Sequence, residues 1–221
     1  MTGIKFCGMT RAEDAVAAVD AGAAYVGVVF AASKRQVDET RAREILQPVR
    51  GRVAAVGVFG ASAPRTRSPS ARAAALDVVQ LHGDPTPADV VAVRSAFGGS
   101  VWAAYRAREG QLGDAALALA DIADALVLDA FHPGALGGTG VTLPWDVLAP
   151  RLVPLRGRRA SIVLAGGLDP ANVGTAIARV GPDIVDVASG VERAPGIKDH
   201  QKLRAFAAAV ETAARAVGRD E

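Results

Sequence analysis

The chain has 221 residues, a length that suits one large domain or two small ones. Hydrophobic residues make up 50% and charged residues 22%, which is typical of a globular protein and excludes a disordered chain. The formal net charge is only +2, so charge does not indicate nucleic acid or a membrane surface as a partner.

Cysteine and histidine usage limits the metal and disulfide chemistry. The single cysteine, Cys7, excludes a disulfide within the chain and a metal site built from several thiolates. The three histidines, His82, His132 and His200, are far apart and have no metal-ligand spacing. The first residues lack the apolar segment of a signal peptide, and no apolar run reaches the ~18 residues of a membrane span. We therefore expect a soluble, cytoplasmic protein that binds no metal.

Short apolar runs recur along the chain and have the length of strands buried on both faces. The eight runs are residues 4–7, 25–30, 53–59, 78–81, 101–105, 125–129, 162–165 and 184–187. Ala-rich amphipathic segments between them predict helices, of which the clearest are residues 12–21, 38–49, 88–97, 145–152, 171–180 and 199–217. Thr10 and Glu13 predict a capping box at the start of the first helix.

Strands that alternate with helices predict a parallel sheet with crossover helices. Eight units in 221 residues favour a compact (β/α)8 TIM barrel. A doubly wound sheet is the alternative, but it usually opens with a Gly-rich nucleotide turn, which is missing after the first run. We predict one α/β barrel domain over residues 1–221. Its third βα unit should be irregular, because Pro64 and Pro69 interrupt residues 61–70.

Glycines follow the last two predicted strands. Gly166 and Gly167 end the seventh strand, and Ser189 and Gly190 follow the eighth. Backbone N–H groups at such turns can approach an anion, and in barrels these two loops frequently bind phosphate. Either turn alone could be only a tight turn, but the two together predict a phosphate site.

Cys7 and Asp129 are the candidate acid–base pair, because they end the first and the sixth predicted strands. An ionisable group after the apolar run of residues 126–128 is costly to bury without a role. A lone cysteine, however, is often only a small buried hydrophobe. Chemistry near neutral pH would require a lowered pKa for the thiol and a raised pKa for the carboxyl group.

Four further residues are candidates at the same end of the barrel. Arg35 follows the second strand and suits carboxylate recognition, although a solvated loop charge is an equal alternative. His82 and Asp186, at the ends of the fourth and eighth strands, are site-lining candidates; His82 could instead only fix a loop. Gly138, in the long loop after the sixth strand, could belong to a lid or contact the ligand through its backbone.

Several short motifs keep one order and spacing from Ile4 to about Phe206. They include Lys5-Phe6-Cys7-Gly8-Met9-Thr10, Ser33-Lys34-Arg35, Val79-Gln80-Leu81-His82-Gly83-Asp84, Leu128-Asp129, Gly137-Gly138-Thr139-Gly140, Leu164-Ala165-Gly166-Gly167-Leu168, Asp186-Val187-Ala188-Ser189-Gly190-Val191-Glu192 and Pro195-Gly196-Ile197-Lys198-Asp199. Together they resemble the phosphoribosylanthranilate isomerase family of tryptophan biosynthesis.

The resemblance implies an isomerase that needs no metal and no other cofactor. Its reaction would be the Amadori rearrangement of N-(5-phosphoribosyl)anthranilate to 1-(2-carboxyphenylamino)-1-deoxyribulose 5-phosphate. By the same resemblance Asp129 is the general acid that protonates the furanose ring oxygen. Cys7, as a thiolate, is the general base that removes the proton from the sugar C2′.

The resemblance also implies how the substrate is held and which alternatives remain. Arg35 matches the position that contacts the anthranilate carboxylate, and the phosphate loops match Gly166, Gly167, Ser189 and Gly190. The partner is then a small phosphoribosyl substrate, bound by a monomer or a homodimer. One alternative is the related histidine-pathway isomerase or a bifunctional barrel, which would have an aspartate in place of Cys7. The other is a catalytically silent phosphate-binding barrel.

Overall fold

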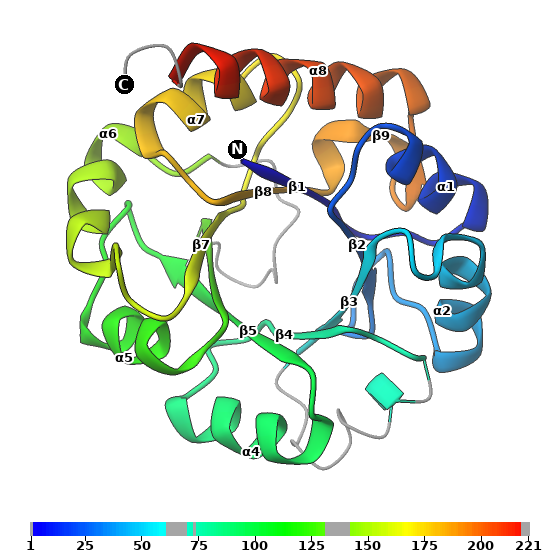
Figure 1. The fold of residues 1–221 in the computed structure, drawn as a ribbon, viewed down its shortest axis with the longest axis horizontal. Coiled ribbons are helices and arrows are strands. Elements are labelled where there is room, and N and C mark those ends of the chain that lie inside the picture. Colours follow the sequence, from blue (N-terminus) through cyan, green and yellow to red (C-terminus); the bar gives the residue numbers. More distant parts are fainter. Residues whose placement is uncertain (1, 61–69, 73, 131–141, 218–221) are drawn as a thin grey trace.

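Eight parallel strands form a closed barrel in the chain order β1 to β8, with helices around the outside (Figure 1). The computed structural model describes residues 2–60, 70–72, 74–130 and 142–217. The strands are β1 (Gly3–Phe6), β2 (Tyr25–Val29), β3 (Ala54–Phe59), β4 (Val78–Leu81), β5 (Ser100–Ala107), β6 (Ala125–Ala130), β7 (Ser161–Leu164) and β8 (Ile184–Val187). The predicted TIM barrel is confirmed. The predicted irregular stretch, residues 61–70, lies almost entirely outside the described residues.

The helices cover the outer face of the barrel (Figure 1). They are α1 (Ala12–Asp20), α2 (Glu39–Leu46), α4 (Pro87–Phe97), α5 (Asp114–Ile122), α6 (Trp145–Leu148), α7 (Val173–Val180) and α8 (His200–Val217). Short 3₁₀ turns are η1 (Gln47–Val49), η2 (Ala149–Leu155) and η3 (Ser189–Val191), and β9 (Glu192–Ala194) pairs antiparallel with β10 (Ile197–Lys198). None of the helices in the described ranges has the length and apolar character needed to cross a bilayer.

The strands separate two apolar cores because neighbouring side chains along a strand point to opposite faces. The inner core fills the barrel and includes Val56, Trp102 and Val127. The larger outer core lies between the strands and the helices and includes Leu81 and Phe206. Each fully buried side chain of this kind contributes about 1.5–3 kcal/mol. The strands are therefore apolar on both faces, which is why they appear in the sequence as continuous apolar runs.

The predicted capping box at the first helix is wrong. The N-cap residue of α1 is Arg11, which makes no side-chain capping hydrogen bond. The Thr10 hydroxyl instead donates to the Gly196 carbonyl oxygen, so a tertiary contact with the β9–β10 hairpin takes the place of the local cap. A capping box does begin α4, where Thr86 and Asp89 bond reciprocally.

Aspartates at the amino-terminal end of the barrel connect neighbouring strands. Asp77, Asp124 and Asp183 directly precede β4, β6 and β8. Their carboxylates accept hydrogen bonds of 2.7–2.8 Å from the backbone N–H groups of Ala55, Val101 and Ile162, near the starts of β3, β5 and β7. Each aspartate therefore fixes the start of one strand against the next, at the end of the barrel opposite the carboxyl ends.

Asp124 provides a test of this arrangement. Burial acts to raise the pKa of its carboxyl group, but the hydrogen bonds from the Val101 N–H and from two guanidinium groups lower it overall. We expect Asp124→Ala to reduce the free energy of unfolding by about 1–3 kcal/mol at pH 7. Because the folded-state pKa is depressed, this contribution is present above the unfolded pKa and is lost as the pH falls through the folded pKa. Urea unfolding at several pH values measures it.

Asp121→Ala is the matched control for this substitution. Among the described residues Asp121 pairs with Arg158, and its side chain is 54% exposed, so its loss should cost less than about 1 kcal/mol. Equal destabilisation by the two variants would contradict the structural role of Asp124.

Candidate active site

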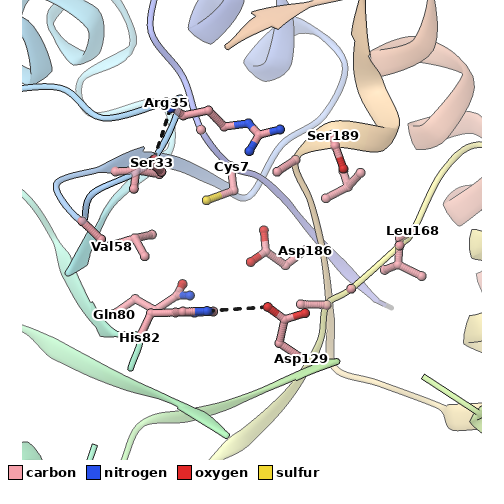
Figure 2. Close-up of a pocket in the computed structure, with 18 of the residues that line it drawn as sticks. Cys7, Ser33, Arg35, Val58, Gln80, His82, Asp129, Leu168, Asp186 and Ser189 are labelled. Carbon is pink, nitrogen blue, oxygen red and sulfur yellow. Dashed lines mark hydrogen bonds and ion pairs between the residues drawn. The ribbon is translucent and has the colours of Figure 1, made fainter. Parts of the chain in front are cut away.

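A cavity opens at the carboxyl ends of the strands, and most of the residues predicted from the sequence line it (Figure 2). Those that line it are Cys7, Arg35, His82, Asp129, Gly166, Gly167, Asp186 and Ser189. Gly190, which packs closely against the Leu168 backbone, is not among the lining residues, and Gly138 lies outside the described residues. The loops after β1, β2, β4, β7 and β8, together with the end of β6, therefore contribute to one site.

The side chains of Lys5, Cys7 and Asp186 lie close together because of the periodicity of β1 and its register with β8. Lys5 and Cys7 are two residues apart along β1 and its end, so both side chains face the inside of the barrel. Asp186 on β8 is the register partner of Lys5. The Lys5 Nζ lies 2.7 Å from the Asp186 Oδ2, and Lys5 is completely buried. The Lys5 ammonium also interacts with the Cys7 thiol.

Cys7 is 8% exposed, and its sulfur faces the cavity (Figure 2). Burial raises the pKa of the Cys7 thiol above its ordinary value, and the nearby Lys5 ammonium opposes that rise only in part. Chemistry near neutral pH would require a shift in the opposite direction. The physical reason for the rise is that removal of the sulfur from water outweighs the attraction of the neighbouring cation.

Asp129 ends β6 and faces the same cavity from another side (Figure 2). Burial raises the pKa of its carboxyl group to about 6, although the Ala130 N–H donates to Oδ1 at 2.8 Å and opposes the rise. The His82 Nε2 lies 3.6 Å from the Asp129 Oδ2, and burial lowers the pKa of His82 to about 4. At neutral pH a neutral imidazole therefore lies beside a carboxyl group that is partly protonated.

Several buried polar atoms of the cavity have no hydrogen-bond partner among the described residues. They are the Gln80 Oε1, both ring nitrogens of His82 and the Asp186 Oδ1. A buried polar group without a partner costs about 1–3 kcal/mol. All three residues line the cavity, so these atoms are available to a polar ligand.

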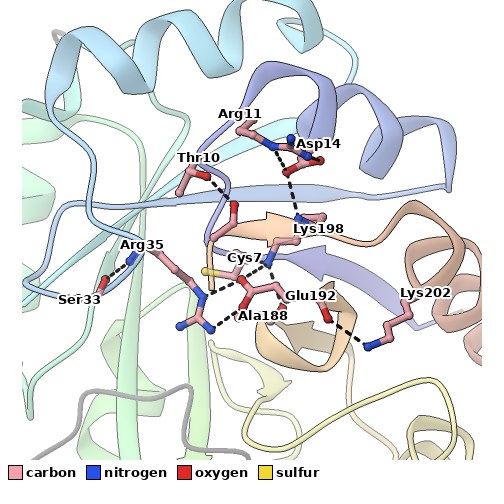
Figure 3. Close-up of polar contacts among 11 residues, drawn as sticks. Cys7, Thr10, Arg11, Asp14, Ser33, Arg35, Ala188, Glu192, Lys198 and Lys202 are labelled. Atoms are coloured by element: carbon pink, nitrogen blue, oxygen red, sulfur yellow. Dashed lines mark hydrogen bonds and ion pairs between the residues drawn. The ribbon is translucent and has the colours of Figure 1, made fainter. Parts of the chain in front are cut away.

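Arg35 is fixed by a buried carboxylate (Figure 3). Its Nε and Nη2 each donate to a different oxygen of Glu192 at 2.7 Å. The Lys198 Nζ also binds Glu192, at 3.0 Å, and donates to the carbonyl oxygens of Cys7 and Ala188. Among the described residues the remaining nitrogen, Nη1 of Arg35, makes no hydrogen bond. The guanidinium is thus oriented from one side and can still bind a carboxylate.

The two glycine loops pack against each other. Gly166 and Gly167 have φ angles of 86° and 62°, which favour glycine, and the Asn172 side chain donates to the Gly167 carbonyl oxygen. A Cβ atom on Gly190 would lie 1.9 Å from the Leu168 carbonyl oxygen, so only glycine permits this approach. The loops that follow β7 and β8 therefore form one continuous wall of the cavity.

Sequence reasoning missed three charged residues of this site. Lys5 was recognisable from its two-residue spacing to Cys7, which places both side chains on one face of the strand. Glu192 and Lys198 lie in segments whose sequence does not indicate that they meet, because their contacts depend on the β9–β10 hairpin. Within the described ranges, no group of three or more His, Cys, Asp or Glu residues could hold a metal ion.

The arrangement can transfer protons to and from a bound molecule on two sides. A carboxyl group with a pKa of about 6 can donate a proton near neutral pH. Opposite it, a thiol beside an ammonium group can act as a base once it is ionised. The glycine loops line the same cavity, and turns of this kind can bring backbone N–H groups close to an anion.

Comparison with known proteins identifies the family. Residues 4–209 match the family model "N-(5'phosphoribosyl)anthranilate (PRA) isomerase". The N-(5'-phosphoribosyl)anthranilate isomerase of Pseudomonas fluorescens is 40% identical over 214 residues, which cover 96% of this chain and 97% of that protein. The crystal structure of phosphoribosyl anthranilate isomerase from Thermotoga maritima has a TM-score of 0.86 at 33% identity and covers 96% of this chain and 100% of that one.

A further solved structure contains a ligand. It is a phosphoribosyl anthranilate isomerase in complex with reduced 1-(o-carboxyphenylamino)-1-deoxyribulose 5-phosphate, with a TM-score of 0.80 and 31% identity, and it covers 96% of this chain and 100% of that one. The resemblance found in the sequence motifs is thereby confirmed. The chain belongs to the phosphoribosylanthranilate isomerase family, whose members are enzymes of tryptophan biosynthesis.

Proposed function

We propose that this chain catalyses the Amadori rearrangement of N-(5-phosphoribosyl)anthranilate with Asp129 as the general acid and Cys7 as the general base. The observation that carries the proposal is that both side chains face one cavity from different sides (Figure 2). Family membership supports the overall reaction, and the cavity geometry supports these two roles. The product is 1-(2-carboxyphenylamino)-1-deoxyribulose 5-phosphate.

The proposed reaction proceeds in two proton transfers. Protonated Asp129 gives its proton to the furanose ring oxygen, the C1′–O bond breaks, and the nitrogen lone pair forms a Schiff base. The Cys7 thiolate then removes the proton from C2′, and the electrons of that C–H bond form the enol-amine. The enol-amine tautomerises to the ketone. A carboxyl pKa of about 6 supports the first step, because a useful fraction of Asp129 carries a proton at neutral pH.

The two ends of the substrate match two parts of the cavity. We assign the anthranilate carboxylate to Arg35, whose guanidinium Glu192 already orients. We assign the phosphate to the glycine loops, at Gly166, Gly167, Ser189 and Gly190. The ligand in the related complex carries both a carboxylate and a phosphate, which supports a phosphoribosyl ligand for this chain.

We propose a single domain over residues 1–221, a cytoplasmic location, no cofactor, and either a monomer or a homodimer. A histidine-pathway isomerase or bifunctional barrel would carry an aspartate where this chain has Cys7. A silent phosphate-binding barrel is disfavoured because its cavity would not need two ionisable groups held at a desolvation cost.

Removal of the proposed base tests the reaction directly. We expect Cys7→Ser to lower kcat by at least about 10²-fold, because a hydroxyl group is a far weaker acid than a thiol and does not ionise near neutral pH. The assay follows the loss of substrate fluorescence, with the substrate generated in situ. Complementation of a tryptophan auxotroph that lacks this isomerase, with Cys7→Ala as the control, tests the same point in cells. Near-normal turnover by Cys7→Ser would remove the thiol from the mechanism.

The proposed acid predicts a characteristic pH profile. In the parent protein kcat/KM should rise up to pH about 6, because the ionised fraction of Cys7 grows while Asp129 stays protonated. Above pH about 6 it should stay level, because the protonated fraction of Asp129 then falls about tenfold per pH unit while the ionised fraction of Cys7 rises by the same factor. Activity should fall only above the thiol pKa. In Asp129→Asn the smaller residual kcat/KM should continue to rise beyond pH 6, because only the thiolate still titrates. A change limited to KM would make Asp129 a binding residue instead.

Arg35 is tested by the balance between KM and kcat. We expect Arg35→Ala to raise KM at least about tenfold, since a charged hydrogen bond contributes about 1.5–3 kcal/mol, and to change kcat much less. Arg35→Lys keeps the charge but not the two-pronged geometry and should be intermediate. Arg52→Ala, which removes an exposed arginine paired with Asp20, is the control. An unchanged KM in Arg35→Ala would dismiss the assignment.

A further inference from the structure

The Lys5–Asp186 ion pair occupies the barrel interior, where branched apolar residues are the usual filling. Lys5 is 0% exposed and Asp186 is 8% exposed, so both charges are removed from water. A buried ion pair is often no more stabilising than apolar residues of the same volume. Stability therefore does not account for the pair, and its neighbours indicate another role.

The Lys5–Asp186 ion pair lies beside Cys7, the proposed base. Lys5 precedes Cys7 by two residues on the same face of β1, and Asp186 reaches the ammonium from β8. Figure 2 shows Cys7 and Asp186 at the same side of the cavity. One oxygen of Asp186 binds Lys5, while the other has no hydrogen-bond partner among the described residues. The Asp186 carboxylate and the Cys7 thiol both raise the pKa of the Lys5 ammonium.

Other charged groups face Cys7 but are already engaged. Lys198 binds the backbone carbonyl of Cys7 and the Glu192 carboxylate, and Arg35 makes two hydrogen bonds to the same carboxylate. The single negative charge of Glu192 therefore pairs with both of these cations. Asp129 and His82 lie across the cavity, and His82 is neutral at pH 7. Lys198 also lowers the pKa of the Cys7 thiol, but Lys5 lowers it more, and Lys5 lies on the same face of β1 as Cys7.

We propose that Lys5 and Asp186 are positioning residues for Cys7. The Lys5 ammonium supplies the counter-charge of the thiolate, and the Asp186 carboxylate holds the ammonium charged and in place between the two anions. This inference rests on the proposed function only in taking the thiolate as the working form of Cys7.

The energetic reasoning concerns two desolvated groups. Burial alone would lower the pKa of Lys5, but the contacts with Asp186 and Cys7 raise it overall, so the ammonium keeps its proton. A thiolate in the same dry region needs a cation within contact distance, because water cannot solvate it. Asp186 has the opposite electrostatic effect on the sulfur, since a carboxylate disfavours a second anion nearby. The two residues therefore act on the thiol in opposite directions.

The single cysteine allows this to be measured without turnover. Because Cys7 is the only thiol of the chain, the rate of alkylation by iodoacetamide as a function of pH reports the ionisation of Cys7 alone. The thiolate absorbance in the ultraviolet gives the same midpoint independently. We expect Lys5→Met to raise the midpoint by at least about 1 pH unit, which slows alkylation about tenfold at a fixed pH below it.

Two further variants test whether the midpoint of Cys7 ionisation can be shifted in the opposite direction and whether it can be restored. Asp186→Asn should lower the midpoint, because the thiol loses a neighbouring negative charge and the ammonium retains the sulfur as its partner. Lys5→Arg keeps the positive charge and should restore most of the midpoint shift seen in Lys5→Met. The pH profile of kcat/KM should move in the same directions as the alkylation midpoint. A merely structural role would change the melting temperature without moving these midpoints in opposite directions.

Lys202→Met is the matched control, because Lys202 binds the Glu192 backbone carbonyl oxygen at the same end of the barrel. Its alkylation midpoint should equal that of the parent protein. An unchanged midpoint in folded Lys5→Met would overturn the proposal. If Lys5→Met does not fold, Lys5→Gln removes the same charge, and an unchanged midpoint in that variant would overturn the proposal equally. Normal turnover by Cys7→Ser would show that Cys7 is not the general base. The midpoints of thiol ionisation would still test whether Lys5 is the counter-charge of the thiolate.

Discussion

Desolvation of ionisable groups at the carboxyl end of the barrel is the constraint on which the site depends. Burial raises the pKa of both Cys7 and Asp129, yet the two shifts have different consequences. The raised carboxyl pKa keeps a proton available on Asp129 near neutral pH, as an acid requires. The raised thiol pKa works against a base, so the thiolate depends on a nearby cation. The buried Lys5 ammonium is the group in contact that can meet this need.

The barrel places stabilising and reactive polar groups at opposite ends. At the amino-terminal end, carboxylates such as Asp124 are fully hydrogen-bonded to backbone and guanidinium groups. At the carboxyl end, Gln80, His82 and Asp186 keep buried polar atoms without partners among the described residues. Unpaired polar atoms are costly, so their concentration in one cavity indicates a ligand that would pair with them. Among the described residues, the Trp145 Nε1 is the one other buried side-chain nitrogen or oxygen without a partner.

The fold was predictable from the sequence because each buried strand is a short apolar run and each loop carries helix or turn signals. The positions of Cys7 and Asp129 followed from the same reading, since the ends of parallel strands meet at one edge. The direction of the Cys7 pKa shift was not predictable, because it depends on how far the folded chain removes the sulfur from water. The absence of a Thr10 cap was not predictable either, because the Thr10 hydroxyl donates instead to the Gly196 carbonyl oxygen, which is distant in sequence. The role of Glu192 in orienting Arg35 likewise depends on a contact across 157 positions.

A crystal structure of this chain with reduced 1-(o-carboxyphenylamino)-1-deoxyribulose 5-phosphate would test the acid–base geometry most directly. We expect the sugar C2′ to lie about 3.5 Å from the Cys7 sulfur, as proton transfer at that carbon requires. The former ring oxygen should lie beside Asp129, with the phosphate on the glycine loops. A bound ligand whose sugar carbons are turned away from the sulfur, or whose former ring oxygen is remote from Asp129, would contradict the assignment of these two residues as base and acid.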